Sequence, residues 1–229
     1  MVEYLFLDLD DTILDFGKAE RDGICATFRE LGLAPTEEVL GRYHVINQAH
    51  WQMLERGELT REQVVVQRFG ALFDEFQCPA DPAECAERYA RNLSSVHDFL
   101  PGALEAVQRL QKKYRLFIAS NGTASVQHRR MTEAKLYPYF EKVFISEHLD
   151  ANKPEKAFFD RSFAQIPGFD PQKAMIVGDS LTSDILGGLN AGMLTCWVNP
   201  DGKEAPETIR PHYTIPSITH LETLLEGLG

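Results

Sequence analysis

Three carboxylates follow the first apolar run of the chain, at Asp8, Asp10 and Asp11 of the segment YLFLDLDDT. Ionised groups this close repel one another, so a cation, a shared proton or solvent has to compensate them. Strand side chains alternate with a period of two, which would direct Asp8 and Asp10 to the same side. Such a pair can supply a nucleophile and a general acid or base. By itself, an Asp-x-Asp pair is as typical of a solvated loop or a Ca²⁺ site as it is of a catalytic pair.

Polar groups also follow three later apolar runs, in the segments SNG (120–122), NKP (152–154) and GDSLTSD (178–184). Ligands of an open parallel sheet bind outside the carboxyl ends of its strands, so these segments would converge with the first one. Together these segments would offer oxygen ligands that suit Mg²⁺. They would also offer one lysine and the main-chain N–H groups of a turn, which suit a phosphate. For Asp184, capping of the helix that reaches Asn190 is the alternative role.

The elements that would carry these groups follow from apolar spacing. Short continuous apolar runs at 116–119, 143–145, 175–177 and 194–198 alternate with helical or loop segments, as in a parallel sheet covered on both faces. From about Phe16 to about Leu100 the spacing is instead helical. We therefore predict an α/β fold with a doubly wound, mostly parallel sheet and an all-helical insertion after the first strand. The predicted core is 1–15 and 101–229, and the predicted helical cap domain is 16–100.

The motifs DLDDT, SNG, the lysine of NKP and GDSLTSD occur in the order found in haloacid dehalogenase-type phosphohydrolases, which the chain resembles from end to end. The resemblance implies that Asp8 attacks phosphorus to form an aspartyl-phosphate, and that Asp10 protonates the leaving oxygen and later activates water. It also implies Mg²⁺ as the cofactor. The expected metal ligands are Asp8, Asp10 through its backbone carbonyl, Asp179 and Asp184. The expected phosphate-binding groups are Ser120, Asn121, Gly122 and Lys153, with Ser120 and Lys153 also counted as catalytic.

A closer resemblance concerns the substrate. The helical insertion after the first strand is similar to that of phosphoglycolate phosphatase and β-phosphoglucomutase. The stretches INQAHWQMLERGELTREQVVVQRF and SDILGGLNAGMLTCWVNPDG look like the YjjG-type pyrimidine 5'-nucleotidases. This implies a 5'-nucleotidase for pyrimidine nucleoside monophosphates, with Phe16, Asn47 and Trp51 as candidates for substrate specificity. Packing inside the cap is the alternative role for these aromatic rings.

Three other functions stay open on the sequence. The chain could be a phosphatase of another small metabolite, such as phosphoglycolate or a sugar phosphate. It could be a phosphomutase like β-phosphoglucomutase, which shares all four motifs. A catalytically silent scaffold is the non-enzyme alternative, although neither the nucleophile nor the lysine is lost.

The composition of the chain limits the classes of partner that this protein is expected to bind. A formal net charge of −11 over 229 residues argues against a surface for nucleic-acid polymers, which requires a basic stripe. No apolar stretch approaches the ~20 residues that a bilayer requires, and no signal sequence is recognised, so no membrane partner is expected. The four cysteines are scattered and form no metal-ligand pattern. We expect a cytoplasmic protein whose partner is a small phosphorylated metabolite; the sequence does not indicate its oligomeric state.

Overall fold

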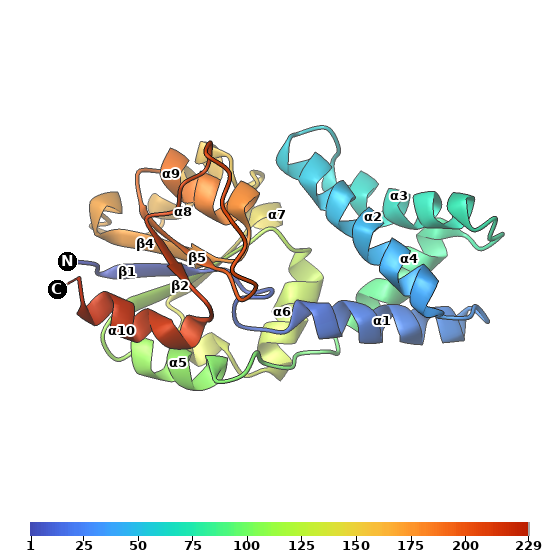
Figure 1. The fold of residues 1–229 in the computed structure, drawn as a ribbon, viewed down its shortest axis with the longest axis horizontal. Helices are drawn as coiled ribbons and strands as arrows, with labels where there is room; N and C mark the ends of the chain where they lie inside the picture. The colour runs from blue at the N-terminus through green and yellow to red at the C-terminus, as the bar shows by residue number, and fades with distance from the viewer. Residues whose placement is uncertain (229) are drawn as a thin grey trace. The chain divides into compact units, whose positions relative to one another are not determined.

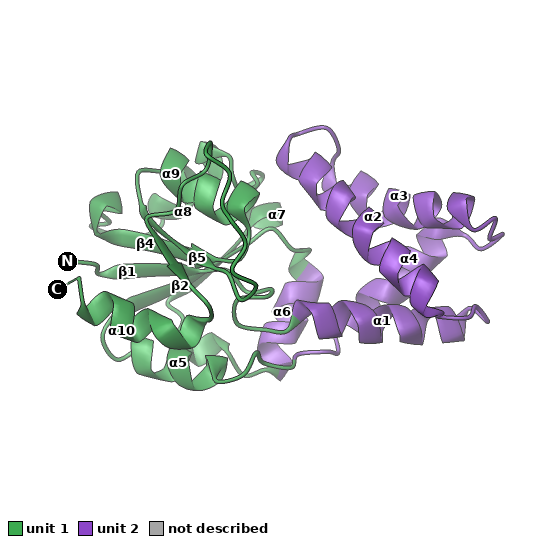
Figure 2. Ribbon diagram, viewed as in Figure 1, with its two compact units in different colours: residues 1–15, 98–124, 134–229 green, residues 16–97, 125–133 purple. Residues whose placement is uncertain are grey.

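The computed structural model describes residues 1–228, which form two compact units (Figure 2). An α/β unit comprises residues 1–15, 98–124 and the chain from 134 onward, and a helical unit comprises 16–97 and 125–133. The sequence placed the boundaries at 15/16 and 100/101, whereas the contacts place the second one at 97/98. They also assign the segment Ser125–Glu133 to the helical unit, which no sequence pattern indicated.

A six-stranded sheet with the order β3-β2-β1-β4-β5-β6 forms the centre of the α/β unit, and every neighbouring pair is parallel. The predicted α/β class, parallel sheet and helical insertion after the first strand are confirmed. The strands lack polar alternation because helices cover both faces of the sheet (Figure 1). The strands are β1 (Tyr4–Leu7), β2 (Arg115–Ser120), β3 (Lys142–Ile145), β4 (Ala174–Gly178), β5 (Leu194–Val198) and β6 (Tyr213–Ile215).

Helices α5 and α10 lie on one face of this sheet, and α8 and α9 lie on the other (Figure 1). Stacked rings of Phe6, Phe117 and Phe144 fill the space beneath the second pair of helices, where Phe158 and Phe159 are fully buried. The helical segments that follow β1 and belong to this unit are α5 (Ala103–Leu110), η1 (Tyr137–Tyr139), α7 (Ser146–Leu149), α8 (Lys156–Phe163), η2 (Pro171–Lys173), the π-helix η3 (Leu181–Ile185), α9 (Leu186–Asn190), η4 (Ile218–His220) and α10 (Leu221–Glu226).

The strand order reverses at β1. The chain passes from β1 to β2 and β3 on one side and returns to β4 on the other, so the carboxyl ends of β1, β2 and β4 are neighbours. Leu7 is in register with Ile118 and with Val177, which places Asp8 level with the ends of both neighbouring strands, one residue before the last of β2 and at the last of β4. This reversal is where open α/β sheets form their ligand sites.

The helical unit packs around the rings of Tyr43, Phe69, Phe73 and Tyr89. Three of its helices begin at local capping signals, such as the reciprocal Thr60–Gln63 capping box. The helices are α1 (Phe16–Glu30), α2 (Glu37–Glu55), α3 (Arg61–Glu75), α4 (Pro82–Leu93) and α6 (Ala124–Glu133), the last of which contributes residues 125–133.

Across residues 1–228, none of the helices combines the length and the apolar character that a membrane-spanning helix needs.

Candidate active site

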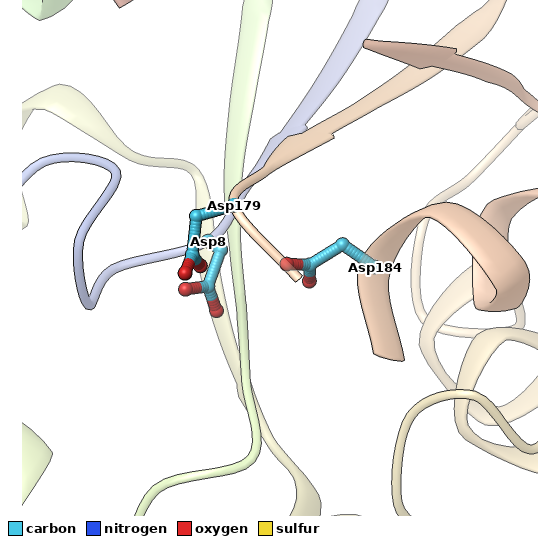
Figure 3. A group of neighbouring side chains, drawn as sticks. All are labelled: Asp8, Asp179 and Asp184. Carbon is cyan, nitrogen blue, oxygen red and sulfur yellow. The ribbon is translucent and has the colours of Figure 1, made fainter. Parts of the chain in front are cut away.

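Three aspartates gather at the strand reversal. Asp8 directly follows β1, Asp179 directly follows β4, and Asp184 lies in η3; each offers a carboxylate oxygen within 4.8 Å of the others (Figure 3). Asp8 and Asp184 are buried and Asp179 is half-buried. An all-oxygen set of this kind suits a hard divalent cation such as Mg²⁺, and the group contains no sulfur or imidazole ligand.

Lys153 extends into the same cluster and is 1% exposed. Its Nζ donates to Asp8 Oδ1 at 2.8 Å, to Asp184 Oδ1 at 2.5 Å and to the carbonyl of Ala119 at 2.6 Å. These three acceptors match the three N–H donors of an ammonium group. The lysine therefore holds both carboxylates, and it could donate to a phosphoryl oxygen only after releasing one of its present acceptors.

The electrostatics of the cluster are dominated by burial. Burial raises the pKa of Asp8 from 3.8 to about 8, against the opposing effect of Lys153 and with added repulsion from Asp184 and Asp10. Burial and the charges of Asp8 and Asp184 also raise the pKa of Asp179 well above its usual value. For Lys153, burial would lower the pKa, but the carboxylates of Asp184 and Asp8 outweigh it and raise the pKa. One ammonium does not balance these carboxylates, which favours a bound cation.

Local structure places Asp184 against the end of β4. The main-chain N–H of Ser180 donates to Asp184 Oδ2 at 3.1 Å. A Cβ on Gly178 would lie 2.1 Å from the same oxygen, so only glycine permits this approach. The hydroxyl of Ser180 accepts from the N–H of Ser183 and caps η3. The cap therefore belongs to Ser180, and the side chain of Asp184 points to the lysine instead.

The SNG turn follows β2 beside this cluster. Ser120 is 1% exposed, and its Oγ accepts from the N–H of Gly122 at 3.1 Å. The side chain of Asn121 bonds to the main chain of Lys153. Glu147 accepts from the N–H of Ala124 at 2.7 Å and so occupies the first turn of α6. The predicted phosphate-binding role of Ser120, Asn121 and Gly122 stays a prediction.

Asp10 is half-buried in the loop after β1, where it forms an isolated bridge with Leu14. Its carboxylate is not one of the three mutually close ones, but its charge contributes to the raised pKa of Asp8. The predicted roles of Asp10 as acid, base and carbonyl ligand stay predictions. Asp11 has φ of 51°, and this left-handed conformation turns the chain away from the strand.

The candidates for substrate specificity all lie in the helical unit. Asn47 is 2% exposed; its Nδ2 donates to Glu20 at 2.6 Å, and its Oδ1 accepts from Arg68 at 2.7 Å. Its amide is thus bonded inside the helical unit. The half-buried ring of Trp51 lies 5.7 Å from the guanidinium of Arg61. That of Phe16 lies 5.9 Å from the guanidinium of Arg130. A role in specificity stays a prediction for all three candidates.

Trp197 was not predicted as a residue of this site, but its side chain contacts the loop of Asp179. Its indole Nε1–H donates to the carbonyl of Asp179 at 2.8 Å. Two signals were available: the residue lies near the end of an apolar run, and a buried indole N–H usually needs an acceptor. The identity of that acceptor depends on β5 lying next to β4, which the sequence does not specify.

Comparison with known proteins agrees with this arrangement. Residues 5–198 match the family model described as haloacid dehalogenase-like hydrolase. The chain is 38% identical to the HAD-hydrolase YfnB of Bacillus subtilis (strain 168) over 221 residues, which cover 96% of this chain and 94% of YfnB. A crystal structure of YfnB bound to magnesium superimposes with a TM-score of 0.93 and covers 98% of both chains.

Two further relatives carry a named activity. The pyrimidine 5'-nucleotidase PynA of Streptococcus pneumoniae (strain ATCC BAA-255 / R6) is 36% identical over 98% of this chain and 95% of its own length. The pyrimidine 5'-nucleotidase YjjG of Escherichia coli (strain K12) is 30% identical over 97% of both chains. With a family model matched across both sheet halves and these near full-length similarities, the chain belongs to the haloacid dehalogenase-like hydrolases.

Proposed function

We propose that this hydrolase is a Mg²⁺-dependent phosphomonoesterase that acts through an aspartyl-phosphate on Asp8. The observation that carries the proposal is the position of Asp8, which shares one buried cluster with Lys153, Asp179 and Asp184 at the strand reversal. A carboxylate nucleophile needs its negative charge, and a neighbouring ammonium at 2.8 Å favours the ionised form.

Mg²⁺ would be held by Asp8, Asp179, Asp184 and the carbonyl of Asp10, and when bound it would offset the negative charge of the phosphoryl group. In the first step an oxygen of Asp8 forms a bond to phosphorus while the bond to the leaving oxygen breaks. Asp10 donates a proton to that leaving oxygen. In the second step Asp10 takes a proton from water, whose oxygen attacks phosphorus and releases the carboxylate of Asp8.

Lys153 has two roles in this proposal. Its ammonium orients Asp8 and Asp184 and offsets charge that accumulates at the reacting centre. Because its three donors are used, contact with a phosphoryl oxygen requires the exchange of one acceptor. Ser120 and the N–H groups after it would hold the remaining phosphoryl oxygens.

For the substrate we propose pyrimidine nucleoside 5'-monophosphates. The support is the near full-length similarity to two proteins named as pyrimidine 5'-nucleotidases. The half-buried ring of Trp51 in the helical unit is the candidate for stacking on a base. Trp51→Ala tests this role: an unchanged ratio of activity on UMP to activity on a sugar phosphate would remove Trp51 from the specificity site.

The test of the proposed function is phosphate release from a panel of dUMP, UMP, dTMP, AMP, phosphoglycolate and glucose phosphates, with and without Mg²⁺. Asp8→Asn serves as the blank, because it replaces the nucleophilic oxygen at nearly constant volume. We expect release to require Mg²⁺ and Asp8, and to be fastest with the pyrimidine monophosphates. Activity that persists in Asp8→Asn or without a divalent cation would contradict the mechanism.

Other outcomes separate the alternatives. Activity confined to sugar phosphates or phosphoglycolate would keep the mechanism and change the substrate. Transfer of labelled phosphate from a sugar bisphosphate to a sugar monophosphate, without net release, would indicate a phosphomutase. Absence of both activities would favour a scaffold.

A further inference from the structure

The side chain of Asn121 forms hydrogen bonds with both the N–H and the carbonyl of Lys153. Its Oδ1 accepts from the N–H of Lys153 at 2.9 Å, and its Nδ2 donates to the carbonyl of Lys153 at 2.8 Å. The amide thus pairs with both main-chain polar groups of the lysine, as a neighbouring strand would. This pairing joins two loops that lie 32 residues apart in the sequence.

The other end of the same lysine is also fixed at β2. Nζ donates to the carbonyl of Ala119 at 2.6 Å, two residues before the asparagine that holds the main chain. Lys153 is therefore held at its backbone by residue 121 and at its ammonium by residue 119. From this position the ammonium reaches Asp8 and Asp184 together. All three N–H donors of the ammonium group are bonded. A shift of the lysine backbone would therefore lengthen or break its bonds to Asp8 and Asp184.

We propose that Asn121 is a positioning residue for Lys153: its side-chain amide fixes the lysine backbone so that the ammonium meets Asp8 and Asp184. This role is separate from the predicted phosphate contact of residue 121, which uses its main-chain N–H. The consequence for catalysis rests on the proposed function, whereas the positioning itself does not.

Two variants and one matched control test the proposal. Asn121→Ala removes both hydrogen bonds. Asn121→Asp keeps the volume but places an oxygen against the carbonyl of Lys153, where the amide nitrogen now donates, and it serves if the alanine variant does not fold. Asn199→Ala is the control, since Asn199 makes the same two bonds to the main chain of Lys203, at 2.9 and 3.0 Å. The side chain of Lys203 is 71% exposed and pairs with Asp201 at 2.8 Å, and the charge of Asp179 adds a weaker attraction.

The first measurement is the rate at which each lysine is acetylated by an N-hydroxysuccinimide ester, followed by peptide mass spectrometry. Lys156, whose side chain is 63% exposed, is the internal reference. We expect Lys153 to be protected in the wild type and in Asn199→Ala. Relative to Lys156, its rate should rise about tenfold or more in both Asn121 variants, because loss of the pairing lets the lysine loop open. An unchanged ratio in these variants would overturn the proposal.

The second measurement is steady-state kinetics with the best substrate of the panel. In the proposed mechanism the lysine orients Asp8 and Asp184 and offsets charge that accumulates in the transition state, so the loss should fall on kcat, by about tenfold or more, with KM within about threefold. Asn199→Ala should stay within about twofold of the wild type. A kcat that is unchanged in Asn121→Ala would overturn the catalytic consequence of this positioning. If the wild type releases no phosphate, the proposed function fails, and the acetylation comparison still decides the position of Lys153.

Discussion

Two opposing effects act on the pKa of the Asp8 carboxyl group. Burial raises its pKa to about 8, while the ammonium of Lys153 at 2.8 Å favours the ionised form. Asp184 and Asp10 add repulsion, so the proton stays on Asp8 over much of the neutral pH range when no cation is bound. A cation that binds this carboxylate must displace that proton, which links metal affinity to pH.

We predict that Mg²⁺ affinity rises with pH up to about 8. For one displaced proton the change is about tenfold per pH unit below the pKa, and it levels off above it. Calorimetric titration with Mg²⁺ at about pH 6.5 and about pH 8.5, in buffers of different ionisation enthalpy, would measure both the affinity and the proton release. Equal affinity at the two pH values, without proton release at the lower one, would contradict the linkage.

The same shift predicts a pH-dependent stability for the cation-free protein. The pKa of Asp8 is higher in the fold than its ordinary value of 3.8, so protonated Asp8 stabilises the fold fully below that value. The contribution is lost as pH rises through about 8. With a chelator present, the unfolding temperature of the wild type should therefore fall as the pH rises from 3.8 to about 8. In Asp8→Asn this decrease should be smaller. A slope that is the same in wild type and Asp8→Asn would assign the pH dependence to other groups.

At the scale of elements, the strand ends carry the site because each apolar run stops at a polar motif. This made β1, β2 and β4 and the polar residues at their ends predictable from the sequence. Strand β6 was not predicted, because it spans only Tyr213–Ile215 and its middle residue is exposed. The pairings of Asn121 with Lys153 and of Trp197 with Asp179 were also missed. Each joins two segments whose proximity follows from strand order, and local spacing contains no information about that order.

Strand β5 supports the loop of Asp179, a proposed metal ligand, through Trp197. We predict that Trp197→Phe, which keeps an aromatic ring but removes the N–H bonded to the carbonyl of Asp179, lowers Mg²⁺ affinity by about tenfold or more. The free energy of unfolding should fall by only about 1 kcal/mol, the usual net value of one hydrogen bond. Titration with Mg²⁺ and chemical denaturation would measure the two effects. A loss of stability with unchanged affinity would show that the indole serves packing alone.

Helices α1, α2 and α3 are joined by a buried chain of hydrogen bonds from Glu20 through Asn47 to Arg68. We predict that Asn47→Ala lowers the free energy of unfolding by about 2–4 kcal/mol, because two buried charged groups lose their shared partner. Asn92→Ala is the matched control in the same unit; its amide bridges Thr27 and Glu30 nearer the surface, and we expect a smaller loss.

Activity distinguishes this structural role of Asn47 from one in substrate choice. With an intact fold, the ratio of kcat/KM on UMP to that on a glucose phosphate should stay within about twofold in Asn47→Ala. A marked change in that ratio, with little loss of stability, would instead support Asn47 as a specificity residue.

At the scale of the whole molecule, the residues of the proposed chemistry and those of the predicted substrate choice belong to two different units. All three clustered aspartates and Lys153 belong to the α/β unit, whereas Phe16, Asn47 and Trp51 belong to the helical unit. A ligand stabilises only the structure that binds it, by about 2.7 kcal/mol at a free concentration one hundred times its Kd. Mg²⁺ should therefore raise the stability of the α/β unit and leave the stability of the helical unit unchanged.

Hydrogen exchange with and without Mg²⁺ would measure this division directly. We predict slower exchange for the amides that follow β1 and β4 and for those of η3, because opening of these segments would release the ion. Amides of α2, α3 and α4 should exchange at unchanged rates. Asp179→Asn is the control, since it removes a candidate ligand and should abolish the effect in the α/β unit. Equal protection of both units by Mg²⁺ would show that the ion stabilises the chain as one cooperative body and that the two units are not energetically independent.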